Sequence, residues 1–480
     1  MKQADINTIP NHEYLELNYV AETATGKGNN QQIIMQVNAN NKNVFDVTEG
    51  RIGIRIGRNR PRTYSLPMTN WDSFYLSKVN RGWLLTKTQK MEKKKITKKG
   101  LSFNGGTYAQ TGIFSVDSII TKLLSYANKV ISDNYSTSVE DISDEMLEYG
   151  NSILTELAKN HDSMSIAEFN NKLKVLYAAI PRRMDNLSKH LAKRKIEFVD
   201  IIDKEQELFD IVYSQVRSNS NLAKYDTMPT VLQAYGLEWR PVSDEEETKI
   251  KKLMGENAKQ YKNAWRIINK KTEKAFNEYC AKENLSDENN GISHLFHGSR
   301  SENFWSIITN GLTINPVGVV TNGKMFGLGT YFANKAKKSM GYTSSSGSYW
   351  THGSEAIGYL GIFKVATGKT YDVTSAESDL TYNVLQQRCP GAHCTFAHAG
   401  HSLCNDEIIV YQDQQSTIEY FVEFTAAQLG GKFMKKKNIY ELKRAGICCE
   451  EEMKKVYRFS PLPPEAITFI NNLHQKKINK

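Results

Sequence analysis

Three stretches of the sequence decide its interpretation. They read LFHGSR at residues 295–300, GKMFGLGTYFA at residues 323–333 and NDEIIVY at residues 405–411. The first places His297 and Gly298 at the end of an apolar run typical of a β-strand, and the third opens another such run with Glu407. Alone, His297 could be a core histidine and Glu407 an exposed carboxylate at a strand end. Their combination favours a functional site in an α+β domain.

In order and approximate spacing, these stretches resemble the catalytic domain of the poly(ADP-ribose) polymerases, with its His, Tyr and Glu triad. The resemblance implies that NAD+ is the substrate, that no metal is needed, and that His297, Tyr331 and Glu407 are catalytic. The residues that it assigns to NAD+ binding are His297, Gly298, Ser299, Asn303, Tyr331, Phe332, Ala333, Lys338, Ser339 and Tyr342.

The resemblance also gives roles to the residues of the nicotinamide pocket. The backbone of Gly298 and the hydroxyl of Ser339 would hold the nicotinamide amide, because glycine allows close backbone approach and a hydroxyl both donates and accepts. Tyr342 would stack on the nicotinamide ring and Tyr331 would wall the pocket. The alternative is that both tyrosines are ordinary core aromatics beside Phe332.

Cleavage of NAD+ passes through an oxocarbenium-like state with positive charge on the ribose. By resemblance, Glu407 would stabilise that charge, bind the ribose 2′-hydroxyl and polarise an acceptor hydroxyl, while His297 would bind the adenosine ribose. Two positions differ from the best-known members of the family. Thr313 stands in place of an arginine near the adenosine half, and Ser306 in place of a glycine.

The chain of 480 residues carries a net charge of +10, most of it at the N-terminal end. Residues 1–110 contain 17 Lys and Arg against 8 Asp and Glu, an asymmetry that favours a polyanionic partner. We therefore expect a multidomain α+β protein. By resemblance to the family, its parts are a β-rich, DNA-contacting module of the Trp-Gly-Arg (WGR) type at 1–110, an all-α regulatory bundle at 111–225, a mixed α+β ADP-ribosyltransferase domain at 226–428 and a basic extension of unknown role at 429–480.

The N-terminal part is expected to form strands at 33–37 and 51–56. Glu49-Gly50-Arg51 stands where the WGR module carries its name-giving motif, with Glu49 in place of the tryptophan. A carboxylate there would repel phosphate, and the basic side chains nearby could instead form a strand face in water. The residues expected to contact DNA are Arg51, Arg55, Arg58 and Arg60.

From about 115 to 217 the apolar residues follow a helical period, and no polar residue is obviously out of place. Ser165 and Glu168 predict a capping box at a helix start, and Pro181 predicts the end of that helix. The region resembles the family's autoinhibitory helical domain, which implies a gate that restricts NAD+ until DNA binds. Beyond it, residues 231–242 are predicted to form a strand.

Other kinds of site have weaker support. Gly368-Lys369-Thr370 lacks the first glycine of a phosphate-binding loop, and Gly327 with Gly329 lacks the βαβ unit of a dinucleotide-binding fold. Four residues could surround a zinc ion, but their spacing lacks the tight pairs of a known zinc finger, and we expect them to be ordinary loop residues. They are Cys389, Cys394, His398 and Cys404.

The sequence shows no apolar run long enough for a signal peptide or a membrane span, and its six cysteines form no evenly spaced framework. We therefore expect an intracellular protein, nuclear in a eukaryote, with no membrane partner. The predicted function is synthesis of poly(ADP-ribose) on protein acceptors, including the protein itself, activated by DNA breaks. The alternatives are transfer of single ADP-ribose units, hydrolysis of NAD+ and a catalytically weak DNA-binding scaffold.

Overall fold

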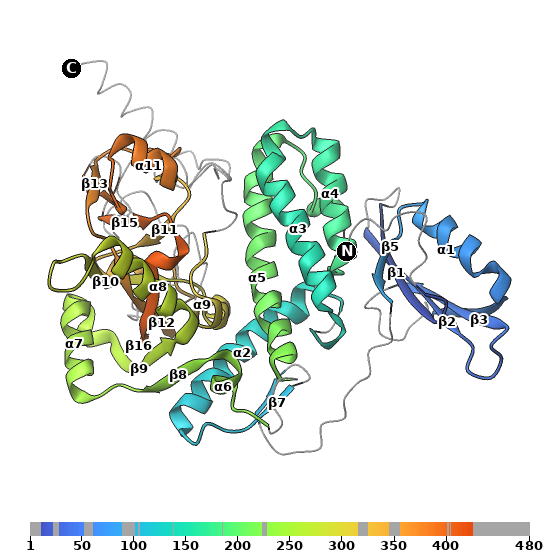
Figure 1. Ribbon diagram of the computed structural model, residues 1–480, viewed down its shortest axis with the longest axis horizontal. Helices are drawn as coiled ribbons and strands as arrows, with labels where there is room; N and C mark the ends of the chain where they lie inside the picture. The colour runs from blue at the N-terminus through green and yellow to red at the C-terminus, as the bar shows by residue number, and fades with distance from the viewer. Residues whose placement is uncertain are drawn as a thin grey trace, which may run out of the picture. The chain divides into compact units, whose positions relative to one another are not determined.

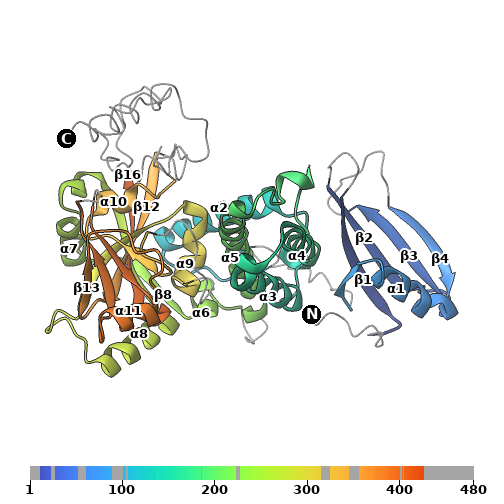
Figure 2. The same cartoon turned by 90° about the horizontal axis from the view of Figure 1, so that it is seen from above.

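The computed structural model describes residues 11–22, 28–51, 61–88, 101–103, 106–137, 139–184, 186–222, 228–314, 325–344, 356–400, 403 and 405–425. These residues form two compact units, whose elements are shown in Figures 1 and 2. The first unit comprises the described residues up to Gly236 together with Glu302–Thr309. The second comprises Leu237–Ser301 and the described residues from Asn310 onward.

The first unit begins with a five-stranded antiparallel sheet in the order β4-β3-β2-β1-β5. Its strands are β1 (Tyr14–Glu22), β2 (Gly28–Val37), β3 (Val44–Arg51), β4 (Arg62–Pro67) and β5 (Leu84–Lys87). Helix α1 (Trp71–Val79) covers one face of this sheet, where its Trp71 and Tyr75 are buried (Figure 1). The strand predicted at 33–37 is confirmed within β2. Of the strand predicted at 51–56, Arg51 ends β3 and the other residues lie outside the described part of the chain.

A short hairpin, β6 (Leu101–Phe103) and β7 (Gly106–Tyr108), precedes the helical part of this unit. The long helices are α2 (Phe114–Asn134), α3 (Asp144–Asn160), α4 (Ile166–Ala179) and α5 (Phe198–Leu222). The predicted capping box of Ser165 and Glu168 is present at the start of α4. Helix α4 ends just before Pro181, as proline chemistry requires.

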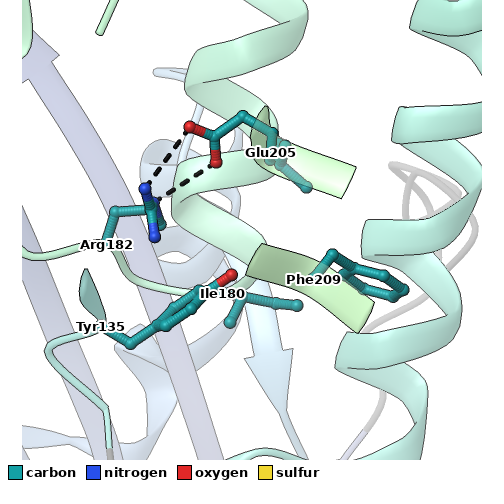
Figure 3. A pocket seen from close by; sticks show the side chains of 6 residues that line it. Tyr135, Ile180, Arg182, Glu205 and Phe209 are labelled. Atoms are coloured by element: carbon teal, nitrogen blue, oxygen red, sulfur yellow. Dashed lines mark hydrogen bonds and ion pairs between the residues drawn. The ribbon is translucent and has the colours of Figure 1, made fainter. Parts of the chain in front are cut away.

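The helices enclose an ion pair that the apolar pattern did not predict. Arg182 and Glu205 are only 2 % and 4 % exposed, and the Arg182 Nε lies 3.4 Å from Glu205 Oε2. Figure 3 shows the two side chains directed at each other, with Tyr135, Ile180 and Phe209 around them. The expectation that no polar residue of this region is out of place is therefore wrong.

Residues 231–242 do not form one strand. Val231–Tyr235 is the short helix α6, and Leu237–Pro241 is strand β8. Thr230 and Gln233 form a capping box that starts the helix, and Gly236 ends it with a positive φ of 65°. Local capping therefore outweighs the apolar composition that favoured a strand.

The second unit is built on two sheets, so the mixed α+β class is confirmed. The larger sheet is antiparallel and has the order β10-β12-β16-β9-β8, and the smaller has the order β11-β15-β14-β13 with β13 parallel to β14. Their further strands are β9 (Tyr261–Asn269), β10 (Ile292–Gly298), β11 (Thr330–Phe332), β12 (Ile357–Ala366), β13 (Thr370–Val373), β14 (Cys394–Ala397), β15 (Glu407–Val410) and β16 (Ser416–Thr425).

The helices of this unit are α7 (Asp244–Met254), α8 (Lys270–Glu283), α10 (Ala336–Met340) and α11 (Tyr382–Arg388), while α9 (Phe304–Asn310) groups mainly with the first unit. One core joins α7 and α10 to the face of the larger sheet. The backbones of Phe296 and Ala333 exchange two hydrogen bonds of 2.9 Å, which tie β10 to the residue after β11. None of the described helices is long and apolar enough to cross a membrane.

Candidate active site

His297 lies near the end of β10, beside the edge of the smaller sheet. Its Nδ1 is 3.0 Å from the carbonyl oxygen of Tyr331, and because a carbonyl only accepts, Nδ1 carries the proton. Burial lowers the pKa of His297, although the bond to the Tyr331 carbonyl opposes this shift. The ring is therefore neutral near pH 7, with Nε2 as its acceptor.

Gly298 and Ser339 meet where β10 ends against α10. A Cβ at position 298 would overlap the carbonyl oxygen of Ser339, so only glycine fits this close approach. Ser339 is 4 % exposed, and its hydroxyl donates to the carbonyl of Phe296 at 3.1 Å. The backbone of Gly298 at the end of β10 and the buried hydroxyl of Ser339 are therefore close together.

Tyr331 belongs to β11 and is fixed by its own loop. Its hydroxyl donates to the carbonyl of Gly327 at 2.9 Å and accepts from the N–H of Phe326 at 3.0 Å. Burial raises the pKa of this tyrosine, so it stays neutral. Gly327 has a φ of 69°, and a side chain there would overlap the carbonyl of Leu380, which explains the glycine of this loop.

Glu407 opens β15 and is only 8 % exposed. Its Oε1 lies 2.9 Å from the Nζ of Lys338, and both side chains are about one-tenth exposed. The same ammonium lies 5.8 Å from the ring centroid of Tyr342, a side chain that is 37 % exposed. Strand β15 pairs with β11, so Glu407 and Tyr331 are held by neighbouring strands.

Most of the residues predicted to bind NAD+ therefore lie within the second unit. Phe332 and Ala333 are buried, and Ser299 is partly buried directly after Gly298. Asn303 differs, because it groups with the first unit. Its Nδ2 donates to Oε1 of Glu207 on α5 at 2.7 Å.

A second contact joins the same two segments. The hydroxyl of Ser306 on α9 donates to the carbonyl of Asp210 on α5 at 3.3 Å. The serine that replaces the family's glycine thus has a partner on α5. Glu207 and Asp210 were not predicted as functional residues, because acidic side chains on an amphipathic helix normally face water.

Two of the four residues considered as metal ligands have other partners in the structure. Cys394 is buried, with its Sγ donating to the carbonyl of Thr367, and His398 binds Asp372 at 2.6 Å. Cys404 lies outside the described residues. Within the part of the chain that the structure describes, no group of three or more His, Cys, Asp or Glu side chains could hold a metal ion.

Of the arginines expected to contact DNA, Arg51 is exposed at the end of β3, whereas Arg55, Arg58 and Arg60 lie outside the described residues. Glu49, which was expected in place of the tryptophan of a WGR module, is bound by side chains of β4 and α1. Its Oε1 accepts from the hydroxyl of Tyr64 and lies 3.0 Å from the Nζ of Lys78. Lys78 therefore offsets the negative charge of Glu49.

Comparisons with known proteins identify the family of this chain. A family model of the poly(ADP-ribose) polymerase catalytic domain matches residues 244–398, which include His297 and Ser339 but end before Glu407. The putative poly [ADP-ribose] polymerase-like 100L of Invertebrate iridescent virus 6 is 32% identical over 161 residues, 32% of this chain and 81% of that protein. Uncharacterized protein 101L of the same virus is 24% identical over 199 residues, 39% of this chain and 77% of that protein.

Poly [ADP-ribose] polymerase 1 of Gallus gallus is 38% identical over 82 residues, which are 17% of this chain and 8% of that longer protein. The chain therefore belongs to the poly(ADP-ribose) polymerase family and is an NAD+ ADP-ribosyltransferase.

Proposed function

We propose that this enzyme builds poly(ADP-ribose) on protein acceptors, itself included, and that DNA breaks activate it. The observation that carries the proposal is the buried carboxylate of Glu407, held by Lys338 beside the strands that bear His297 and Tyr331. A carboxylate in this setting can stabilise positive charge on the NAD+ ribose and accept a hydrogen bond from a hydroxyl.

The nicotinamide end of NAD+ would bind between Gly298 and Ser339. The backbone at Gly298 can pair with the carboxamide, and the Ser339 hydroxyl can turn from the Phe296 carbonyl to the ligand. Tyr342 would stack on the ring, and it is 37 % exposed, so part of this residue is accessible to a ligand. Tyr331 would close the opposite side, since its hydroxyl is already satisfied within its loop.

The two riboses of NAD+ would bind His297 and Glu407. The neutral His297 offers Nε2 as an acceptor for a hydroxyl of the adenosine ribose, because Nδ1 is used by Tyr331. Glu407 would accept from the 2′-hydroxyl of the nicotinamide ribose as the glycosidic bond breaks. The same carboxylate can polarise the hydroxyl of a bound ADP-ribose chain, which favours a polymer over a single unit.

The helical part of the first unit would act as the gate of this enzyme. Glu207 occupies the side-chain amide of Asn303, and α5 also binds α9 through Ser306. If Asn303 contacts the adenosine half of NAD+, Glu207 competes for that contact until α5 is released. Release by DNA is a population shift between two states of the bundle.

The N-terminal sheet would sense DNA through its positive charge. Arg51 is exposed at the end of β3, and the neighbouring basic residues Arg55, Arg58 and Arg60 extend the charge along the sequence. Phosphate contacts of this kind make binding fall steeply with salt. An enzyme that answers DNA breaks would act in the nucleus of a eukaryotic cell.

The test incubates the full chain with labelled NAD+, with and without nicked duplex DNA, and separates the products on a gel. A ladder that grows with DNA supports the proposal. A single shifted band would mean transfer of single units, and label released as free ADP-ribose would mean hydrolysis. Arg51→Gln should reduce stimulation by DNA while leaving DNA-free turnover unchanged, and a rate that does not respond to DNA in the intact chain would contradict activation.

A further inference from the structure

In the second unit, Asp406 and Glu407 are consecutive residues, and both bind the segment at 334–338. The Nδ2 of Asn334 donates to Oδ2 of Asp406 at 3.0 Å. Four residues after Asn334, the Nζ of Lys338 lies 2.9 Å from Oε1 of Glu407, the residue next to Asp406. The segment that leads into α10, with Lys338 of the helix itself, therefore binds two consecutive residues, Asp406 and the first residue of β15.

The other oxygen of Asp406 is also bound. Its Oδ1 accepts from the backbone N–H of Ala399 at 2.9 Å, just after β14. These bonds, first the one from Ala399 and then the one from Asn334, with the charges of Lys335 and His398, outweigh burial and lower the pKa of Asp406. Asp406 is thus an ionised carboxylate that ties together the end of β14, the start of α10 and the start of β15.

Glu407 needs such a tether because of its place in the strand. It is the first residue of β15 and pairs with Ala397, the last residue of β14, so the ladder restrains it from one side only. Strand ends open more readily than strand centres. Because Asp406 directly precedes Glu407, a tether on the Asp406 side chain restrains the backbone of Glu407 without occupying the Glu407 carboxylate, which lies 2.9 Å from Lys338.

We propose that Asn334 and Asp406 form a positioning pair that sets the orientation of Glu407 toward NAD+. The proposal rests on the catalytic role proposed for Glu407 and extends it to Asn334 and to Asp406, which lies in the NDEIIVY stretch but was given no role by the resemblance. Asn334 is exposed and Asp406 is partly buried, so neither is needed for the core. Misplacing a catalytic group by about 1 Å can cost on the order of 100-fold in rate.

The test exchanges donor and acceptor between the two positions. Asn334→Asp sets two carboxylates against each other and breaks the bond. Adding Asp406→Asn restores it in reverse, because Asn at 406 can donate to Asp at 334 while still accepting from the Ala399 N–H. The full chain with nicked DNA and labelled NAD+ gives kcat and KM for chain elongation, and the affinity for nicotinamide reports whether the pocket is intact.

The expected result is that Asn334→Asp lowers kcat by roughly 10- to 100-fold, leaves nicotinamide affinity unchanged, and is rescued by the exchange. The proposal is overturned if Asn334→Asp keeps the wild-type kcat, if the exchanged pair is as slow as the single variant, or if nicotinamide affinity falls in step with kcat. Lys335→Gln is the control, since it removes a charge near Asp406 without a hydrogen bond and should leave kcat unchanged. An equal fall in kcat for Lys335→Gln would mean that charge near Asp406 causes the effect, and it would overturn the proposed positioning pair.

Glu407→Gln in the same assay separates the two ideas. If this variant elongates like the wild type, the catalytic role of Glu407 fails. If Glu407→Gln is slow while Asn334→Asp is not, the proposed catalytic role stands and the positioning pair fails.

Discussion

The buried pair of Arg182 and Glu205 allows the most direct test of how the helical part is held together. Glu205→Gln keeps the shape of the side chain but removes its charge. The amide can still accept from the hydroxyl of Tyr177, which lies 3.4 Å from Glu205 Oε1. What remains is a guanidinium with only 3 % of its side chain exposed that has lost the carboxylate of Glu205.

The magnitude follows from that burial. Removing one partner of a buried ion pair costs about 3–5 kcal/mol, because the remaining charge is left in a medium of low polarity. Replacing both charges by apolar side chains of similar volume is close to neutral or stabilising by about 1–4 kcal/mol. Arg182→Met combined with Glu205→Leu should therefore be at least as stable as the wild type, whereas Glu205→Gln alone should be clearly less stable.

The assay is native-state hydrogen exchange of the full chain, read by mass spectrometry on peptides of α4 and α5. At about 1.4 kcal/mol per tenfold, Glu205→Gln should reduce protection of α5 by roughly two to four orders of magnitude. The double replacement should restore it. Unchanged protection of α5 in Glu205→Gln would refute the reasoning, and so would a double variant whose protection is as low as that of the single variant.

The same variant also bears on the proposed gate. Glu205 and Glu207 are two residues apart on α5, about 200° around the helix, so one faces the bundle and the other faces Asn303. Loosening α5 through Glu205→Gln should therefore release Asn303 and raise DNA-free transfer. The double replacement should return that activity to the wild-type level.

Three further predictions concern single side chains. Ser339→Ala should weaken nicotinamide binding by about 1–3 kcal/mol, measured by calorimetry, and unchanged affinity would remove Ser339 from the amide site. Glu207→Ala should lower the KM for NAD+ without DNA, because it removes the carboxylate that accepts from Asn303 Nδ2, and an unchanged KM would speak against competition at that residue. Burial alone would raise the pKa of Glu419, but the hydrogen bond and charge of His294, with nearby cations, hold it at about 2. The stability that this depressed pKa confers is present above the ordinary value of 4.5 and is lost as pH falls toward 2, so Glu419→Gln should flatten acid unfolding between those values.

Much of the transferase unit could be predicted from local sequence. The apolar runs at 264–268, 292–296, 358–365 and 408–411 all lie in or directly beside observed strands, because a buried strand needs little more than such a run and short flanking loops. The capping box predicted at Ser165 is present, and Ser243 with Glu246 forms another at the start of α7. The strand predicted at 231–242 was wrong, because Thr230 and Gly236 begin and end a short helix within this apolar segment.

The contacts that tune the site could not be predicted in this way. Glu207 and Asn303 are 96 residues apart, and nothing in the helical period distinguishes an acidic residue that binds a partner from one that faces water. The pairing of Lys338 with Glu407 has the same character, although each residue was expected in the NAD+ site. The ion pair of Arg182 and Glu205 could not be predicted, because the helical period of the apolar residues shows which face is buried and does not identify charged side chains within it.

The central claim is that ADP-ribosyl transfer by this chain depends on the carboxylate of Glu407. The measurement that tests it most directly compares Glu407→Gln with the wild type, using labelled NAD+ and nicked DNA, with nicotinamide affinity measured on the same samples. The amide preserves shape but not charge, so nicotinamide affinity should be unchanged while chain elongation falls on the order of 100- to 1,000-fold. Polymer of wild-type length and rate from Glu407→Gln would contradict the account.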